Sequence, residues 1–241
     1  TLDRSSAASD VYKRQRYATV DENTQFQRMY GSTPYLAQTE WIARHAADYK
    51  IPFAIHLGDI VDQQGKPAQW EIADAAMQVL EDAEVPYSIL AGNHDVIRDV
   101  DYVNAGSQST DTDAQRTLAN EPYLKWFPTT RSARQATFGG RDSSGFHEFH
   151  IFEAEGQSFL VLSLSWRVSD AGLDWARQVL AQHPTLPAIL VNHQLLNIAS
   201  DGTSPLEVPY GLMLWDRLIK DNDQIFMTLN GHYHGASRLT K

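Results

Sequence analysis

The pattern of apolar and polar residues predicts helices and strands that alternate along most of the chain. Apolar residues spaced three and four apart predict helices over residues 33–50, 67–81, 170–182 and 211–220. Apolar or alternating runs predict strands at residues 52–57, 86–90, 146–152, 158–164, 188–191 and 224–229, with residues 17–20 ending an earlier strand. Such alternation is typical of an α/β protein in which helices cover a sheet.

The segment 97–145 follows neither the helical nor the strand period. It is rich in Ser, Thr, Gly and Asp, and its sequence predicts no long helix or strand. Irregular segments of this length inside a domain are usually functional. We therefore expect residues 97–145 to shape a pocket.

Four predicted strands end in side chains that bind metal ions well. They are followed by Asp59, by Asn93-His94-Asp95, by His193, and by His232 and His234. Ligands of open α/β sheets bind at the carboxyl ends of strands, and imidazole and carboxylate groups suit Zn, Mn or Fe. A lone Gly-Asp pair is more often a turn, but four such strand ends together indicate a metal site. The spacing of two also predicts that both C-terminal histidines lie on one side of an extended segment.

These residues carry a resemblance to a known family. Gly58-Asp59-x-x-Asp62, Gly92-Asn93-His94-Asp95, Asn192-His193 and Gly231-His232-x-His234 resemble, in order and spacing, motifs two to five of the calcineurin-like metallophosphoesterases. The resemblance covers residues 16–241. Within the family, the chain resembles more specifically a bacterial branch whose first motif reads Asp-Thr-Gln. It implies a single domain with a four-layer α/β/β/α sandwich of two mixed sheets flanked by helices.

The resemblance also implies roles for individual residues. Asp59 would bridge two metal ions, Asn93, His193 and His232 would complete the second site, and His234 would join the first. His94 would lie outside both coordination shells near the leaving group, with Asp95 holding its ring in one tautomer. Asp62 would orient ligands or simply cap a turn. Both readings of Asp62 remain open at this stage.

The first motif departs from the family pattern. It reads Asp21-Glu22-Asn23-Thr24-Gln25, which puts Asn23 at the position of an Asp and makes Asn23 and Gln25 the implied ligands. Asp21 lies two residues too early, although a local bulge would let it reach the metal instead. Neutral amide oxygens neutralise less cationic charge than a carboxylate does, so we expect a weaker first site.

The implied activity is hydrolysis of small-molecule phosphate monoesters or diesters. Two divalent ions (Mn, Fe or Zn, with Mn favoured) would activate a hydroxide, and His94 would act as general acid. Three alternatives remain: a metal-binding but catalytically weak or inactive binding module, a zinc amidohydrolase, and a protein-serine/threonine phosphatase. Asn23 and Gln25 favour the first, whereas the His94-Asp95 pair argues against it. The Gly-Asn-His-Asp pattern argues against the second, and Arg98 as the single arginine beside the motifs argues against the third.

Composition and charge limit the partners. The net charge of −10 argues against binding of duplex nucleic acid through a broad basic face. The chain contains no cysteine, which excludes disulfides and thiolate ligands, and it has no apolar run long enough to span a membrane. Neither feature predicts an oligomeric state.

Both ends of the chain carry expectations of their own. Residues 10–15 (Asp-Val-Tyr-Lys-Arg-Gln) match the translation of a transposon-type sequencing adapter, so we expect residues 1–15 to be a non-native artefact and residues 16–241 to be the domain. We also expect the domain to be truncated at both ends, with further strands beyond Lys241. The sequence does not predict the cellular compartment. Export is compatible with it, because a leader peptide would be missing together with the native N-terminus.

The remaining histidines and tryptophans are expected to be structural. His45 and His183 are assigned to the surface and His56 to the core. His147 and His150 lie on a strand, and a substrate role for His147 is the less favoured reading. The scattered tryptophans favour core filling over a stacking platform.

Overall fold

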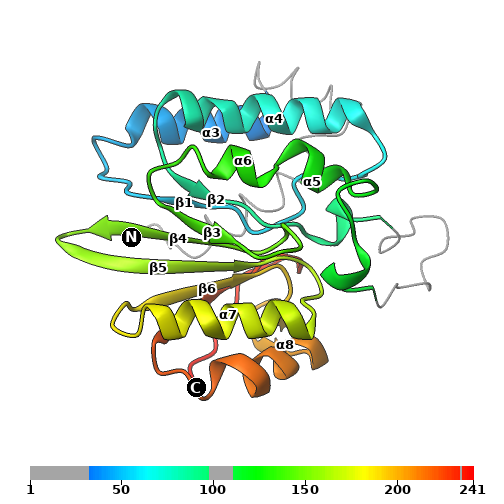
Figure 1. The fold of residues 1–241 in the computed structure, drawn as a ribbon, viewed down its shortest axis with the longest axis vertical. Helices are drawn as coiled ribbons and strands as arrows, with labels where there is room; N and C mark the ends of the chain where they lie inside the picture. The colour runs from blue at the N-terminus through cyan, green and yellow to red at the C-terminus, as the bar shows by residue number, and fades with distance from the viewer. Residues whose placement is uncertain (1–32, 98–110, 234) are drawn as a thin grey trace.

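The structure, a computed structural model, describes residues 33–97, 111–233 and 235–241. Its elements form layers in the order helices, small sheet, large sheet, helices (Figure 1). The four-layer α/β/β/α arrangement is therefore confirmed. Among the described helices, none is both long and apolar enough to cross a bilayer.

The first helical layer covers the small sheet. Helix α3 (Pro34–His45) begins at Thr33, whose hydroxyl accepts the N–H of Leu36 at 3.4 Å. It packs against α4 (Pro67–Asp82), and the short helices α5 (Pro122–Trp126) and α6 (Thr129–Ser132) lie beside them (Figure 1). Helix α3 is shorter than predicted because residues 46–50 form turns that end at Lys50 with a φ of 49°.

The two sheets differ in size and direction. The small sheet pairs β1 (Ala54–Ile55) and β2 (Tyr87–Ser88) in parallel. The large sheet has the order β3-β4-β5-β6-β9, where β3 is Phe138–Arg141, β4 Glu148–Ala154, β5 Gln157–Leu164, β6 Ala188–Asn192 and β9 Ile225–Leu229. Strands β5, β6 and β9 are parallel, whereas β3 and β4 are antiparallel to their neighbours. Consequently the carboxyl ends of the parallel strands meet at one edge.

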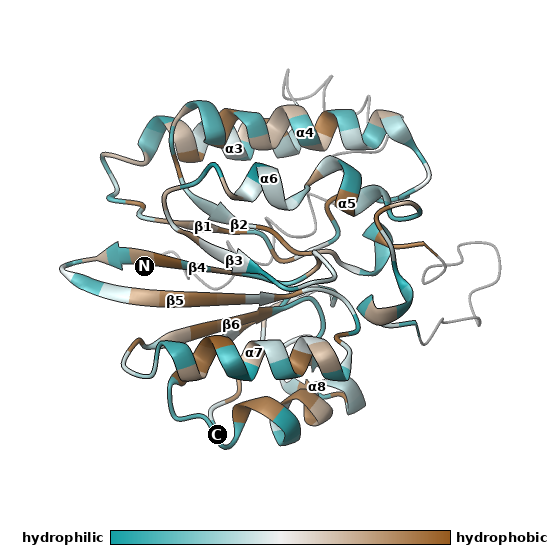
Figure 2. Ribbon diagram, in the orientation of Figure 1, coloured by the Kyte–Doolittle hydropathy of each residue, from teal (hydrophilic) through white to brown (hydrophobic). Residues whose placement is uncertain are grey.

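The last layer consists of α7 (Asp170–Gln182) and α8 (Pro209–Leu214), the latter continuing as a π-helix over Trp215–Ile219. Strands β5 and β6 are apolar over most of their length because both faces of the large sheet are covered (Figure 2). One apolar cluster fills each space between layers, with Trp70, Val161 and Leu173 as representative members. Burial on both faces explains why these strands read as continuous apolar runs.

Several short elements were not predicted. Strand β3 lies in the segment that the sequence left irregular, as do α5 and α6, and the hairpin of β7 (Leu196–Ile198) and β8 (Pro205–Glu207) was also missed. Strand β3 reads Phe-Gly-Gly-Arg, and two glycines give it low strand propensity. It forms because Arg141 pairs with Glu148 of β4 in the ladder. Strands β1 and β2 are shorter than predicted.

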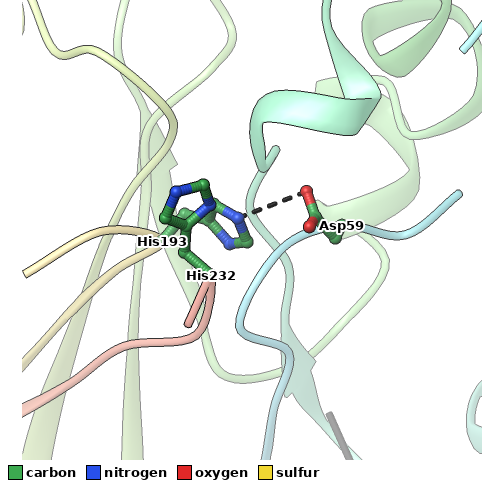
Figure 3. A group of neighbouring side chains, drawn as sticks. All are labelled: Asp59, His193 and His232. Carbon is green, nitrogen blue, oxygen red and sulfur yellow. Dashed lines mark ion pairs between the residues drawn. The ribbon is translucent and has the colours of Figure 1, made fainter. Parts of the chain in front are cut away.

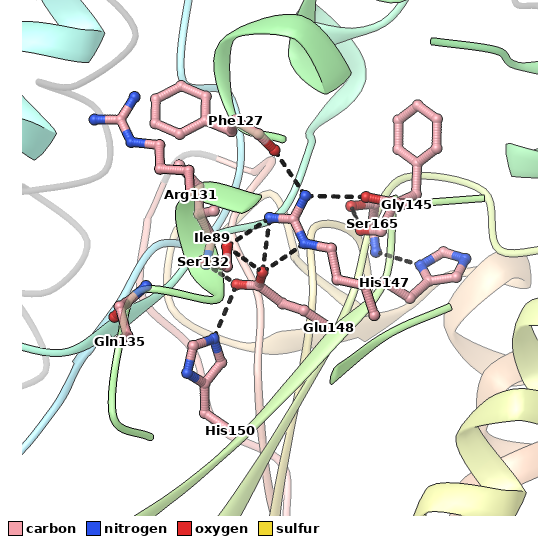
Figure 4. Close-up of polar contacts among 12 residues, drawn as sticks. Ile89, Phe127, Arg131, Ser132, Gln135, Gly145, His147, Glu148, His150 and Ser165 are labelled. Atoms are coloured by element: carbon pink, nitrogen blue, oxygen red, sulfur yellow. Dashed lines mark hydrogen bonds and ion pairs between the residues drawn. The ribbon is translucent and has the colours of Figure 1, made fainter. Parts of the chain in front are cut away.

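Glu148 forms a buried ion pair within the large sheet and also binds the loop that follows the small sheet (Figure 4). Glu148 accepts hydrogen bonds from the Ile89 N–H at 2.8 Å and from the Ser132 hydroxyl at 2.9 Å. The Arg141 guanidinium donates to the same carboxylate from Nε at 2.8 Å, and His150 Nε2 lies 3.3 Å away. Burial alone would raise the pKa of Glu148, but Arg141 and His150 outweigh it and lower that pKa to about 2. Glu148 therefore anchors the segment that leads from β2 to the loop 89–95.

Candidate metal centre

Asp59, His193 and His232 meet at the carboxyl edge of the sheets (Figure 3). Asp59 follows β1, His193 follows β6 and His232 follows β9, so the strand ends bring together residues that are far apart in sequence. Their ligand atoms all lie within 4.8 Å of one another. The structure thus brings together three of the residues that the sequence predicted as ligands.

Hydrogen bonding sets the orientation of His193. Its Nδ1 lies 2.7 Å from the carbonyl oxygen of Leu57, which only accepts, so Nδ1 carries the hydrogen. Nε2 is thereby directed at Asp59 Oδ1, 3.2 Å away. Burial alone would lower the pKa of His193, but Asp59 outweighs this and raises it. Conversely, burial would raise the pKa of Asp59, but His193 and His94 hold it well below its usual range, so Asp59 is a carboxylate at neutral pH.

Asn93 completes the cluster with an amide oxygen. Its Oδ1 lies 3.1 Å from His193 Nε2 and 3.0 Å from His232 Nδ1. Burial and the nearby His193 lower the pKa of His232 to about 3, so this ring is neutral and suited to ligation. In neutral His193 the Nε2 lone pair faces two oxygen atoms, Asn93 Oδ1 and Asp59 Oδ1. An imidazole nitrogen and two oxygens directed at one place are donors that a divalent cation binds, so the residues present fit such an ion.

The backbone is shaped for this convergence. A Cβ on Gly92 would lie 2.3 Å from Asp59 Oδ1 and 2.8 Å from His193 Cε1, so only glycine fits there. Asp59 and His232 have φ values of 52° and 66°. Left-handed backbone costs a non-glycine residue about 1–2 kcal/mol and is retained mainly at functional sites. The predicted extended segment at His232 is therefore wrong, because the chain turns sharply after β9.

His94 lies beside the ligands but is oriented differently from the prediction. Its Nε2 is 3.9 Å from Asp59 Oδ2, and its Nδ1 is 2.7 Å from the main-chain oxygen of Asp62. The Asp62 carboxylate lies 3.7 Å from the same nitrogen. The residue that holds the ring is thus Asp62, and not Asp95 as the sequence suggested.

Asp95 instead organises the loops that carry the ligands. Its carboxylate accepts the N–H groups of Ile60 at 3.0 Å, Val61 at 2.9 Å and Gly92 at 2.7 Å. These three donors engage both oxygens of the carboxylate. Asp95 therefore joins the loop after β1 to the loop after β2, which fixes Asp59 relative to Asn93.

The other predicted ligands are not placed. Asn23, Gln25 and His234, together with Asp21 and Arg98, lie outside the described residues. Their roles remain predictions from the family resemblance.

A second group of possible ligands, Asp113, Asp142 and His147, lies elsewhere and is explained by the fold. His147 is fully buried; its Nδ1 accepts the N–H of Ser165 at 3.1 Å, and its Nε2 lies 3.1 Å from Asp113. The Asp113 carboxylate also accepts the N–H of Ser169, the residue that caps α7. This network positions α7.

His56 is also buried, as predicted. Its Nδ1 accepts the N–H of Gly58 at 3.1 Å, which supports the turn that carries Asp59.

Trp166 and Arg167 were missed. They follow β5, and the Trp166 ring lies 5.1 Å from the His232 ring and 5.5 Å from the His193 ring, centroid to centroid. Trp166 is buried in the core, as predicted, and also contacts both histidines, whereas the exposed Trp41 does not fill the core. The strand-end rule that found Asp59 and His193 would have found Arg167 if it had been applied to arginine.

Comparison with known proteins agrees with this geometry. The sequence profile of the family described as "Calcineurin-like phosphoesterase" matches residues 9–236. The chain is also 30% identical over 203 residues to a Bacillus subtilis (strain 168) protein named "Uncharacterized protein YvnB", with 84% of this chain and 14% of that protein covered. The chain thus spans about one seventh of the length of that relative. With this match over most of its length and an Asp/His cluster at the sheet edge, the chain belongs to the calcineurin-like phosphoesterase family.

Proposed function

We propose that the protein hydrolyses small-molecule phosphate monoesters or diesters at a centre of two divalent cations, with His94 as general acid. One observation carries the proposal. A carboxylate, an amide oxygen and two imidazoles converge from four strand ends, and the His94 ring lies beside them. Family membership supports metal-dependent phosphoester hydrolysis as the reaction class.

Asp59, Asn93, His193 and His232 are the residues that would hold the cations. In this proposal Asp59 would serve both cations, and Asn23, Gln25 and His234 would help to hold the first. Bound divalent cations would neutralise charge on the phosphate and lower the pKa of the attacking water. Manganese is the favoured ion because the donor set mixes imidazole with several oxygen atoms.

His94 supplies the proton in this mechanism. The Asp62 carbonyl accepts from Nδ1 at 2.7 Å, so that nitrogen carries a hydrogen in both charge states of the ring. The second proton therefore resides on Nε2, which faces the cluster 3.9 Å from Asp59 Oδ2. From there it is donated to the alkoxide oxygen as the phosphorus–oxygen bond breaks, which typically contributes about 10²–10⁴-fold.

Three substitutions test these assignments. Manganese content and turnover are measured for wild type, Asp59→Asn, His94→Gln and the control His183→Gln, which lies at the end of α7 away from the cluster. Substrates are p-nitrophenyl phosphate, bis(p-nitrophenyl) phosphate and phenyl phosphate. We expect Asp59→Asn to lose metal, whereas His94→Gln retains metal and loses about 10²–10⁴-fold in kcat, most strongly with phenyl phosphate.

Two results separate the alternatives. Full turnover of phenyl phosphate by His94→Gln would refute the general-acid assignment, because a poor leaving group depends most on protonation. Metal uptake by wild type without turnover of any ester would instead support the non-catalytic binding module.

A further inference from the structure

Arg167 lies at the same edge of the sheets as the metal cluster and has a strained backbone. It follows β5 and has a φ of 57°. Asp59 after β1 and His232 after β9 are the other described non-glycine residues at this edge with positive φ, and both belong to the cluster. The remaining described cases, Lys50, Glu84 and Glu155, lie in turns outside the cluster. Arg167 therefore shares this backbone conformation with two of the four candidate ligands.

Neighbouring groups hold this backbone from both sides. The carbonyl of Arg167 accepts the N–H of Asp113 at 3.3 Å, and the next N–H, of Val168, donates to the Tyr210 hydroxyl at 2.9 Å. The preceding N–H, of Trp166, donates to the carbonyl of Ala91 at 2.9 Å. Ala91 directly precedes the Gly92-Asn93-His94 segment, so Arg167 is fixed relative to the metal ligands.

Two aromatic rings support the guanidinium. Its central carbon lies 4.3 Å from the Trp166 ring centroid and 4.8 Å from the Tyr210 ring centroid. The Trp166 ring in turn lies 5.1 Å from the His232 ring. Arg167 is therefore one ring removed from a metal ligand. Stacking of this kind restricts the side chain while its donors stay free to bind an anion.

Among the residues that the structure describes, no carboxylate forms an ion pair with Arg167. By contrast, Arg116, Arg131 and Arg141 each pair with Asp or Glu. The side chain is half-buried. A half-buried cation held beside residues that bind cations is well placed to receive an anionic group of a ligand.

Resting on the proposed function, we propose that Arg167 binds a second phosphate group of the substrate, beyond the one held at the metal ligands. The Trp166 ring lies between Arg167 and His232, so Arg167 would bind a group other than the phosphate that reacts at the metal ligands. The planar guanidinium matches phosphate oxygens in a two-point hydrogen bond. The preferred substrate class is then phosphoesters that carry another phosphate group.

Binding of non-hydrolysable phosphonates tests this assignment independently of catalysis. The Mn²⁺-loaded protein is titrated calorimetrically with methylphosphonate and with propylene bisphosphonate. We expect wild type to bind the bisphosphonate more tightly than the monophosphonate. Arg167→Gln should weaken bisphosphonate binding about 10–100-fold and change monophosphonate binding less than about 3-fold, since hydrogen bonds to charged groups contribute about 1.5–3 kcal/mol. Arg167→Lys should recover part of the loss, and the exposed Arg134→Gln should match wild type.

The outcomes separate this inference from the proposed function. Equal weakening of both phosphonates by Arg167→Gln, or wild-type binding without preference for the bisphosphonate, would overturn the role of Arg167. Wild type that binds the bisphosphonate preferentially and hydrolyses no ester would overturn the proposed reaction but leave the second-phosphate site in place. A melting temperature of Arg167→Gln within about 2 °C of wild type excludes loss of folding as the cause.

Discussion

Replacing Glu148 by glutamine should cost the protein a large part of its stability at neutral pH. Glu148 is fully buried and accepts from Ile89, Ser132 and Arg141. The substitution keeps the volume but removes the charge that compensates the buried Arg141. Breaking a buried ion pair on one side typically costs about 3–5 kcal/mol, which approaches the whole stability of many domains.

The pH dependence gives a second measure of the same interaction. The pKa of Glu148 falls from 4.5 to about 2 in the folded protein. A depressed carboxyl pKa contributes stability that is fully present above the unfolded value and is lost as the pH falls through the folded value. Each pKa unit corresponds to about 1.4 kcal/mol, so this group alone contributes about 3 kcal/mol that disappears between about pH 5 and pH 2.

Urea unfolding between pH 7 and pH 3 measures both effects. Glu148→Gln should unfold at lower urea at pH 7 and should lose less stability on acidification than wild type does. Glu153→Gln is the matched control, because Glu153 lies on the same strand and is exposed. The double variant Arg141→Met/Glu148→Leu should lose less unfolding free energy than the single variants Arg141→Met and Glu148→Leu lose when their losses are added together. A free energy of unfolding for Glu148→Gln within about 1 kcal/mol of wild type at pH 7 would refute the reasoning.

Three further predictions concern the metal centre. Gly92→Ala should weaken Mn²⁺ binding strongly in a metal titration, because the added methyl group would lie 2.3 Å from Asp59 Oδ1; unchanged affinity would show that the loops adjust freely. Asp95→Asn should lower the urea midpoint and Mn²⁺ affinity together, since an amide cannot accept from all three N–H donors of residues 60, 61 and 92, and an unchanged midpoint would contradict this. Asn23→Asp should tighten the weaker of two Mn²⁺ affinities while Asp21→Ala has little effect; the reverse result would identify Asp21 as the ligand.

The sequence alone predicted the order of the longer helices and strands and brought forward the candidate metal ligands. Strands β5 and β6 could be predicted because their sequences are continuous apolar runs, which are typical of strands in a sheet that is covered on both faces. Asp59, Asn93, His193 and His232 were found because each follows a strand, and parallel strands deliver their carboxyl ends to one edge. Strand β3 escaped prediction because its stability comes from pairing with β4 and from the contact of Arg141 with Glu148.

Only the tertiary structure decided which groups hold the side chains of His94 and Arg167. Asp95 is adjacent to His94 in sequence, yet the N–H groups that bind its carboxylate come from residues 60, 61 and 92, and the His94 ring is held by Asp62. Arg167 likewise gains its position from Trp166 and from Tyr210, a residue distant in sequence. Periodicity reports which face of an element is buried, whereas a hydrogen-bond partner or a ring contact depends on how loops from different strands meet. That meeting is set by packing across layers, which no local pattern encodes.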